Sequence, residues 1–301
     1  MTLRALQFGA SGQLARELCD RAGERVEIKA LSRADVDLMD TAAVARAIGA
    51  EPVLDLVINA AAYTAVDKAE DEPDLAYAIN AWAPAAMAKA CAERGAALVH
   101  ISTDMVFSGA KAAAYVETDA PAPLHVYGAS KLAGEQAVLA ACDRAVVLRV
   151  SWLFSAYGQN FLQAMLRLAQ SQPRLRVVAD QRARPTASGD LAAFILDQAP
   201  RLAAAPAGAK EWGLLHFTNA GVTTRHEMAQ AIFALAWPDR PPPEIEPIAT
   251  RDFPTPARRA LNAELDCSRL AQVFGVTPRP WRDALGEAIA ALAAAQDRKV
   301  A

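Results

Sequence analysis

A glycine turn between a short strand and a helix constrains the fold of this chain most. Residues 3–8 alternate apolar and polar side chains as a strand does, and Gly9 and Gly12 follow directly. Residues 16–21 then have a helical pattern, and residues 26–31 read as a second strand. Strand, glycine turn, helix and strand form the βαβ unit that binds a dinucleotide, since Gly9 permits the tight turn and Gly12 allows close approach of a pyrophosphate.

The helix after this turn supports the same interpretation. Ala15 stands where a small residue allows close packing of the helix on the strand, and the first N–H groups of the helix would face the phosphates. A glycine turn also occurs in α/β proteins that bind no nucleotide. The strand and helix on either side favour the nucleotide site here.

Strands and helices alternate over the first half of the chain. The apolar strands are centred on Leu6, Ile28, Val57, Val99 and Val147, and the clearest helices cover residues 42–48, 75–94 and 131–141. This alternation predicts an α/β fold with a Rossmann-type, doubly wound parallel sheet and right-handed crossovers. We expect an NAD(P)-binding domain at 1–151, a smaller C-terminal substrate-binding domain over most of 152–301, and a return of part of 187–220 to the first domain.

The second half of the chain is less regular. Expected elements there are helices at 161–169, 191–198 and 281–296 and short strands at 177–178 and 215–217. Residues 237–260 are rich in Pro and Arg and are expected to be irregular. Pro84 predicts a kink or break inside the helix at 75–94. The apolar face of the terminal helix fits either a core or an interface.

Tyr127 and Lys131 stand four residues apart, so on a helix they share one face. A free phenol has a pKa of about 10, and a nearby ammonium group favours the phenolate and lowers that pKa. The pair therefore suits proton transfer to or from a substrate oxygen. The same spacing is common on solvated helix faces, so the motifs upstream decide its meaning.

One of those motifs is a strand at residues 97–101 that ends in Ser102, Thr103 and Asp104. An open α/β sheet binds its ligand beyond the carboxyl ends of its strands, where a hydroxyl can hydrogen-bond a substrate oxygen. The three residues also fit an ordinary loop or a helix cap.

The glycine turn, the hydroxyl-bearing strand end and the Tyr-x-x-x-Lys motif together resemble the extended short-chain dehydrogenase/reductase family. Further segments match the dTDP-4-dehydrorhamnose reductase family within it, in the expected order: residues 12–14, 59–70, 102–107, 127–135, 149–152 and 180–186. The resemblance covers residues 3 to about 290. The chain departs from the usual pattern at Ala15, Met105, Ser108 and Ala183, and none of these changes removes a group that the chemistry needs.

The resemblance implies an NADPH-dependent reduction of the C4 keto group of dTDP-4-dehydro-L-rhamnose to dTDP-L-rhamnose, a step towards polysaccharide precursors. The implied catalytic residues are Thr103, Tyr127 and Lys131, with Ser102 as an alternative hydroxyl. The expected cofactor-binding residues, besides Tyr127 and Lys131, are Gly9, Ser11, Gly12, Gln13, Leu14, Arg33, Asp37, Leu38, Ala60, Ala61, Ala62 and Tyr63. The nucleotide-sugar substrate is expected at Thr103, Asp104, Val106, Trp152, Asn160, Gln181 and Arg184.

The end of the second strand bears on the choice of cofactor. An acid about 20 residues past the glycine turn contacts the ribose 2′-hydroxyl of NAD, whereas an arginine accommodates the phosphate of NADP. The sequence reads Ser32-Arg33, which favours NADPH. NADH stays open, because Asp35 lies close and Arg33 could be a solvated loop residue.

Several residues of the second half could hold the substrate. Trp152 could stack on the sugar or belong to the core, and Arg184 could pair with a diphosphate through its forked guanidinium group. A cluster of arginines could do the same or form a solvated face: Arg251, Arg258 and Arg259. We expect Phe107 to pack rather than bind.

Composition narrows the class of protein. A net charge of −3 gives no electrostatic footprint for nucleic acid. With no signal peptide and no apolar run near 18 residues, we expect no membrane contact and a cytoplasmic location. The cysteines and histidines lack metal-ligand spacing, so no metal site is expected, although a need for Mg²⁺ and a homodimer both stay open. Most of the four cysteines are expected to be buried thiols: Cys19, Cys91, Cys142 and Cys267.

Two alternatives remain open at this point. A related enzyme, such as a reductase for another keto sugar or a nucleotide-sugar epimerase, would share these motifs, but an epimerase would retain its oxidised cofactor through turnover. A non-catalytic NADP-binding regulatory subunit would have little reason to keep Tyr127 and Lys131 together.

Overall fold

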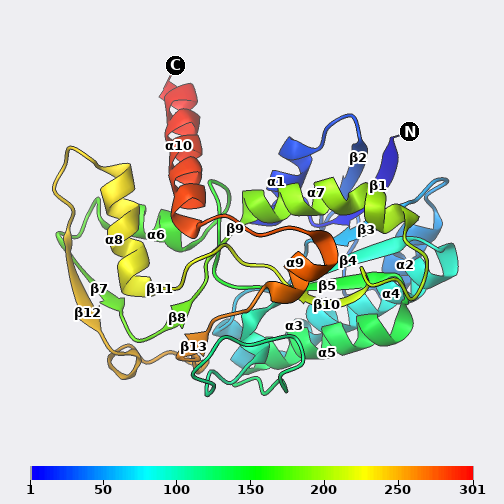
Figure 1. Ribbon diagram of the computed structural model, residues 1–301, viewed down its shortest axis with the longest axis horizontal. Coiled ribbons are helices and arrows are strands. Elements are labelled where there is room, and N and C mark those ends of the chain that lie inside the picture. Colours follow the sequence, from blue (N-terminus) through cyan, green and yellow to red (C-terminus); the bar gives the residue numbers. More distant parts are fainter. Residues whose placement is uncertain (1, 301) are drawn as a thin grey trace.

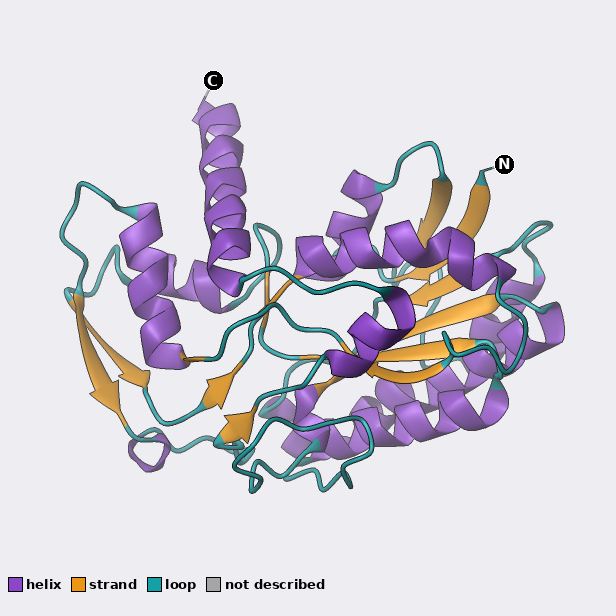
Figure 2. Cartoon of the chain, in the orientation of Figure 1, coloured by secondary structure: helices purple, strands orange, loops and turns teal. Residues whose placement is uncertain are grey.

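The computed structural model describes residues 2–300 of the chain. Its largest feature is a parallel sheet covered by helices on both faces (Figures 1 and 2). The strands are β1 Leu3–Phe8, β2 Val26–Leu31, β3 Leu56–Asn59, β4 Ala97–Thr103, β5 Ala145–Val150 and β10 Gly213–His216. They pair in the order β10-β5-β4-β3-β1-β2, and all neighbours run parallel. The predicted Rossmann-type fold is confirmed.

Successive strand residues face opposite sides of the sheet, and both sides are buried. Leu56, Val99 and Leu148 belong to the core under one group of helices: α1 Gln13–Arg21, α7 Ser188–Ala204 and α9 Ser268–Phe274. Val57 and Leu98 belong to the core under the other group: α2 Thr41–Gly49, α4 Ala83–Arg94 and α5 Val126–Ala141. This double burial explains why the strands read as nearly continuous apolar runs.

The strand order reverses at β1, which has β2 on one side and β3 on the other. A reversal of this kind leaves a crevice at the carboxyl ends of the strands, where dinucleotides bind in doubly wound sheets. The sheet is completed from the second half of the chain, because β10 pairs with β5 and α7 packs against α1 (Figure 1).

The helix predicted at 75–94 is interrupted. A short helix, α3 Pro73–Tyr77, runs into a π-helical segment, η2 Ala78–Trp82, and α4 starts at Ala83. Pro84 lies in the first turn of α4, where its missing N–H leaves no hydrogen bond unmade. The chain stays helical from Pro73 to Arg94, so the kink or break expected at this proline takes the form of a π-helical segment just before it.

A smaller lobe stands beside the sheet (Figure 1). Its helices are α6 Phe161–Leu168, α8 Arg225–Ala236 and α10 Trp281–Val300. Its short strands form three groups: β7 Arg174–Val178 with β12 Glu244–Ile248, β6 Leu153–Phe154 with β9 Thr186–Ala187, and β8 Arg182–Ala183 between β11 Thr223–Thr224 and β13 Asn262–Ala263.

The expectation that residues 237–260 are irregular is wrong for β12. This strand pairs in parallel with β7 over its whole length. Its Pro247 is tolerated because β12 is an edge strand, where a missing N–H breaks no sheet hydrogen bond on the open side. Ile245 packs against the main core of the lobe, and Ile248, on the opposite face of the strand, is buried outside that core.

The terminal helix α10 uses its apolar face inside the lobe. Leu285 is fully buried, and Ile289 and Leu292 pack against the same core as α8. The sequence left this apolar face as either core or interface, and the structure shows that it belongs to the core of the lobe. Among the described residues, no helix combines the length and apolarity needed to cross a bilayer.

Candidate active site

The glycine turn lies between β1 and α1 at the strand-order reversal. Gly9 has a φ of +98°, and a Cβ there would lie 3.2 Å from the backbone of Ala60 and Ala61 after β3. Gly12 caps α1 without a side chain, so no side chain occupies the first N–H groups of that helix. The Oε1 atom of the neighbouring Gln13 is buried without a hydrogen-bond partner. These features fit a dinucleotide pyrophosphate, whose oxygens accept from such N–H groups.

The other expected cofactor contacts surround this turn. Ser11 is exposed and Leu14 is buried on α1, while Ala62 and Tyr63 continue the partly exposed segment after β3. The Tyr63 N–H donates to the Oδ1 atom of Asn80 at 2.9 Å, which ties this segment to η2.

The residues after β2 leave Arg33 accessible. Asp35 accepts hydrogen bonds at its Oδ2 atom from the Ser32 N–H at 2.8 Å and the Ser32 hydroxyl at 2.6 Å, so its carboxylate is engaged within its own turn. Arg33 is exposed, and within the described chain no ion pair holds it. Asp37 accepts from the Met39 N–H, and Leu38 packs on the core. The turn thus presents a guanidinium group rather than a free acid.

The catalytic candidates meet where β4 ends. Tyr127 and Lys131 lie on the buried face of α5, and Thr103 is the last residue of β4. The Lys131 ammonium donates to the Ile101 carbonyl at 2.6 Å. The Thr103 hydroxyl donates to the Oδ1 atom of Asp104 at 2.8 Å.

Ser102 is committed elsewhere. Its hydroxyl donates to the Glu135 carboxylate, one turn beyond Lys131 on α5. Glu135 also accepts two hydrogen bonds from the buried Arg149 guanidinium, at 2.8 and 2.6 Å. This network fixes α5 against β4 and β5, and it favours Thr103 over Ser102 as the hydroxyl of the site.

The electrostatics of Tyr127 differ from the sequence-based expectation. Burial raises the pKa of its phenol above the ordinary value, the charge of Asp104 raises it further, and only the Thr103 side chain lowers it. Lys131 is not among the groups that shift this pKa, so the expected lowering by the ammonium group does not appear, and the net shift is upward because burial penalises the phenolate. Burial lowers the pKa of Lys131 to about 8, against a smaller opposing effect of Glu135.

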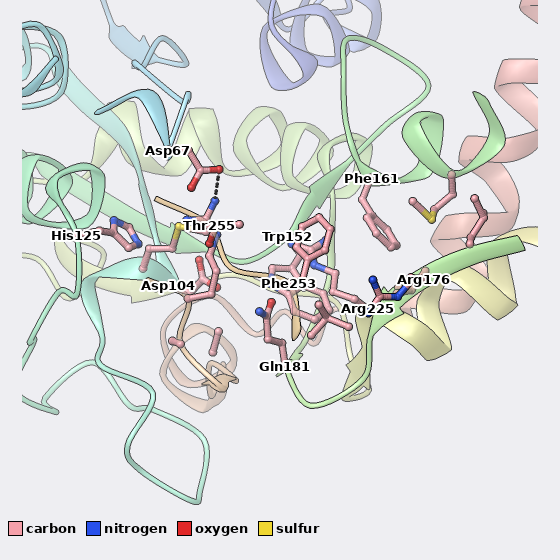
Figure 3. A pocket seen from close by; sticks show the side chains of 18 of the residues that line it. Asp67, Asp104, His125, Trp152, Phe161, Arg176, Gln181, Arg225, Phe253 and Thr255 are labelled. Atoms are coloured by element: carbon pink, nitrogen blue, oxygen red, sulfur yellow. Dashed lines mark hydrogen bonds and ion pairs between the residues drawn. The ribbon is translucent and has the colours of Figure 1, made fainter. Parts of the chain in front are cut away.

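A cavity of about 640 Å³ opens beside these residues, between the sheet and the smaller lobe (Figure 3). Three of the predicted substrate-binding residues line it: Asp104, Trp152 and Gln181. Phe107 lines it as well, although its ring is buried and stacks on Tyr115 as expected. Aromatic and aliphatic walls with a few charged groups are typical of small-molecule sites.

Besides Thr103, which ends β4 next to Asp104, three other predicted substrate residues are outside this cavity lining. Val106 is fully buried in a small apolar cluster. Asn160 caps α6 by accepting from the Gln163 N–H. Arg184 donates twice to Glu264, at 3.1 and 2.6 Å, so its guanidinium is already paired.

Sequence reasoning missed several residues that line the cavity: Asp67, His125, Arg225, Phe253 and Thr255. Asp67 forms an ion pair of 2.9 Å with Arg259, the one member of the predicted arginine cluster in the lining. Arg251 and Arg258 are exposed. Asp67 lies within a motif segment, which could have identified it, whereas Arg225 follows two threonines with no pattern of its own.

The unusual positions are accommodated locally. The Met105 carbonyl packs against Gly128 of α5, and Ala15 is fully buried against the sheet. Cys91 and Cys142 are buried as expected, but Cys267 is only partly buried and Cys19 is exposed. Within the described residues, no group of three or more His, Cys, Asp or Glu side chains is arranged to hold a metal ion.

Comparison with known proteins gives a match over nearly the whole chain. The family model described as the RmlD substrate binding domain matches residues 3–294. The dTDP-4-dehydrorhamnose reductase of Mycolicibacterium smegmatis is 42% identical over 299 residues, which is 98% of this chain and 88% of that protein.

Comparison with solved structures gives matches to proteins of the same description. A dTDP-4-dehydrorhamnose reductase from Clostridium acetobutylicum is 35% identical, with a TM-score of 0.89, and one from Bacillus anthracis in complex with NADP is 32% identical, with a TM-score of 0.88. Each alignment covers 96% of this chain and 99% of the other.

Proposed function

This chain belongs to the RmlD substrate binding domain family, and from that membership we propose that it is a dTDP-4-dehydrorhamnose reductase. The reaction is reduction of the C4 keto group of dTDP-4-dehydro-L-rhamnose to the hydroxyl of dTDP-L-rhamnose with NADPH. One observation carries the chemistry: Thr103, Tyr127 and Lys131 meet beside a cavity at the same sheet edge as the glycine turn.

NADPH, when bound at the glycine turn, supplies the hydride that C4 of the sugar accepts. The Thr103 hydroxyl, once it turns from Asp104 to the substrate, and the Tyr127 hydroxyl would both donate to the C4 oxygen as negative charge develops on it. The Tyr127 hydroxyl then transfers its proton to that oxygen, which completes the alcohol. Because burial raises the pKa of Tyr127, the phenol is protonated at neutral pH, the state that a reduction requires.

Lys131 makes the deprotonated tyrosine tolerable after the transfer. Its ammonium group lies one helical turn from Tyr127, and the Ile101 carbonyl holds it in place. We propose that it also hydrogen-bonds the nicotinamide ribose. The cofactor phosphates would contact the N–H groups around Gly12 and the 2′-phosphate would contact Arg33.

The assay combines the purified protein with dTDP-4-dehydro-L-rhamnose and NADPH and follows NADPH absorbance and dTDP-L-rhamnose formation. Stoichiometric loss of both substrates supports the reductase. Loss of NADPH only with another 4-keto sugar would move the assignment to a related reductase. Conversion of a nucleotide sugar without net NADPH consumption would identify an epimerase.

Tyr127→Phe tests the proton donor. Removal of the hydroxyl is expected to lower kcat by about 10²–10⁴-fold, since general acid catalysis contributes that much. Binding of NADPH, measured by fluorescence titration, should persist. Tyr77→Phe, on the neighbouring α3, is the matched control and should retain full turnover. Undiminished kcat in Tyr127→Phe would exclude the acid role.

Three further proposals concern the setting of the enzyme. Its four cysteines are free thiols, which fits a cytoplasmic, reducing compartment. A homodimer remains a prediction that sedimentation of the purified protein would test. A requirement for Mg²⁺ would be tested by turnover in the presence of a chelator.

A further inference from the structure

Arg225 is the first residue of α8, and the sequence fixes it there firmly. Thr224 caps the helix by accepting from the Glu227 N–H at 3.1 Å, and the Thr224 N–H donates to the Glu227 carboxylate at 2.9 Å. This reciprocal capping box locks the first turn. A cation at the start of a helix opposes the helix dipole, so Arg225 does not serve the stability of α8.

The Arg225 guanidinium stacks on aromatic rings at the cavity wall (Figure 3). Its Cζ atom lies 3.7 Å from the centroid of Trp152 and 4.9 Å from that of Phe161. Among the described residues, none accepts a hydrogen bond from the Arg225 side chain, so its forked N–H donors remain available to a planar or tetrahedral anion.

Within the described residues, no carboxylate lies within ion-pair distance of Arg225, whereas the other arginines of the cavity are paired. Arg174 and Arg176 bind Glu246, and Arg259 binds Asp67. A largely desolvated cation without a partner costs free energy unless a ligand supplies the opposite charge.

The one acid near Arg225 is already engaged. Asp104 accepts from the Thr103 hydroxyl at 2.8 Å and from the Ser151 hydroxyl at 2.8 Å. Burial lowers the pKa of Arg225 to about 10, so the group stays cationic at neutral pH. Arg259 adds a second positive charge nearby, because its charge contributes to lowering the same pKa.

The position of Arg225 relative to the proposed catalytic residues also bears on its role. Arg225 lines the same cavity as Asp104, which directly follows Thr103 at the end of β4. In a nucleotide-linked hexose, the C1 atom that carries the diphosphate lies across the ring from C4. A cation that lines the same cavity on another element, the N-terminus of α8, therefore suits the diphosphate.

Trp152 provides the platform for this arrangement. Its φ of +44° is the single positive value among the described non-glycine residues. Strained backbone of this kind persists where the surroundings enforce it, and it clusters at ligand sites.

We propose that Arg225, held over the Trp152 ring, binds the diphosphate of the nucleotide-sugar substrate, with Arg259 as a second cation. The inference rests on the proposed function for the sugar, but the site itself is one for a nucleoside diphosphate. It replaces Arg184, which the sequence suggested for this role and which Glu264 occupies.

Calorimetric titration with dTDP and with thymidine tests the assignment in the absence of turnover. Arg225→Met should weaken dTDP binding by at least about tenfold, because a charge-assisted hydrogen bond is lost. Thymidine affinity should stay within about twofold of the wild type, since thymidine carries no phosphate. Arg225→Lys keeps the charge but loses the planar fork, and its dTDP affinity should lie between that of the wild type and that of Arg225→Met. Arg240→Met is the matched control, because Arg240 is an exposed arginine that lies over the ring of Trp237, and neither residue lines the cavity.

Equal losses of dTDP and thymidine affinity in Arg225→Met would show that Arg225 only shapes the cavity, and unchanged dTDP affinity would equally overturn the proposal. NADPH affinity reports whether each variant folds, and if Arg225→Met does not fold, Arg225→Lys decides by the same comparison. A wild-type protein that binds dTDP through Arg225 but does not reduce dTDP-4-dehydro-L-rhamnose would uphold this inference while removing the proposed reaction.

Discussion

At the residue scale, Lys131 is nearly fully buried, and we expect its ionisation to affect turnover. Its ordinary pKa of 10.5 falls to about 8 because burial penalises the ammonium. In the pH range just above neutrality, part of the protein population therefore loses the Lys131 charge, which we proposed to stabilise a deprotonated Tyr127.

The expected result is a fall in kcat/KM as pH rises through about 8, since this parameter reports groups of the free enzyme. Lys131→Arg keeps its charge throughout this range, so its kcat/KM should not fall as pH rises through about 8, even if its maximal rate is lower. If the fall in kcat/KM remained unchanged in Lys131→Arg, it would report the ionisation of another group.

The same shift affects stability with a definite sign. The folded protein releases the Lys131 proton at a pH of about 8, whereas the unfolded chain releases it near 10.5. Below about 8 the buried charge therefore costs stability, and this cost disappears between about 8 and 10.5. Relative to Lys131→Met, the wild type should gain stability across this window in urea titrations.

Arg33 belongs to the residue scale as well. Because Asp35 is engaged with Ser32, Arg33 is the group available to a 2′-phosphate. Arg33→Ala should raise Kd for NADPH by about tenfold or more and leave Kd for NADH nearly unchanged. Arg46→Ala, an exposed arginine on α2, is the control. Parallel losses for both cofactors would mean that Arg33 does not recognise the phosphate.

At the scale of elements, α5 approaches its neighbours without intervening side chains. A Cβ at Gly128 would overlap the Met105 carbonyl, and one at Gly134 would overlap the Asn80 carbonyl of η2. Both obstacles are backbone and cannot rotate away. The close contact holds Tyr127 and Lys131 against the end of β4.

Gly134→Ala should therefore destabilise the protein by about 1–3 kcal/mol and lower kcat, because α5 must shift. Gly286→Ala in α10 is the matched control, since a Cβ there meets nothing within 4 Å. It should be neutral or stabilising by up to about 1 kcal/mol, as expected for alanine in a helix. Urea unfolding measures both, and equal stability of the two variants would contradict the packing argument.

At the scale of the whole molecule, the first half of the chain does not complete its own core. Leu191 and Ile195 of α7 and Leu215 of β10 are fully buried in the same core as Val99 of β4. A fragment of residues 1–151 should therefore lack cooperative unfolding and expose apolar surface. A fragment of residues 1–224, which includes α7 and β10, should have a near-ultraviolet circular dichroism spectrum closer to that of the full chain than the 1–151 fragment has. Cooperative unfolding of the 1–151 fragment would contradict the conclusion that the first half of the chain needs α7 and β10 to complete its core.

The sequence by itself determined the features that depend on neighbours along the chain. The glycine turn, the buried strands, the helix irregularity at Pro84 and the shared face of Tyr127 and Lys131 all follow from local spacing and conformational preference. These features were sufficient for the fold class and for the family. The β12 strand escaped prediction because its pairing with β7 lies about 70 residues away along the chain.

Only the tertiary structure decided how charged groups are used. Arg184 could bind a diphosphate until folding brings it to Glu264, 80 residues away, and Arg225 is unremarkable until it stacks on Trp152. The pKa of Tyr127 likewise rises rather than falls, because burial depends on what covers a group. Charge pairing and desolvation arise from long-range packing, so residue type and spacing alone do not determine them.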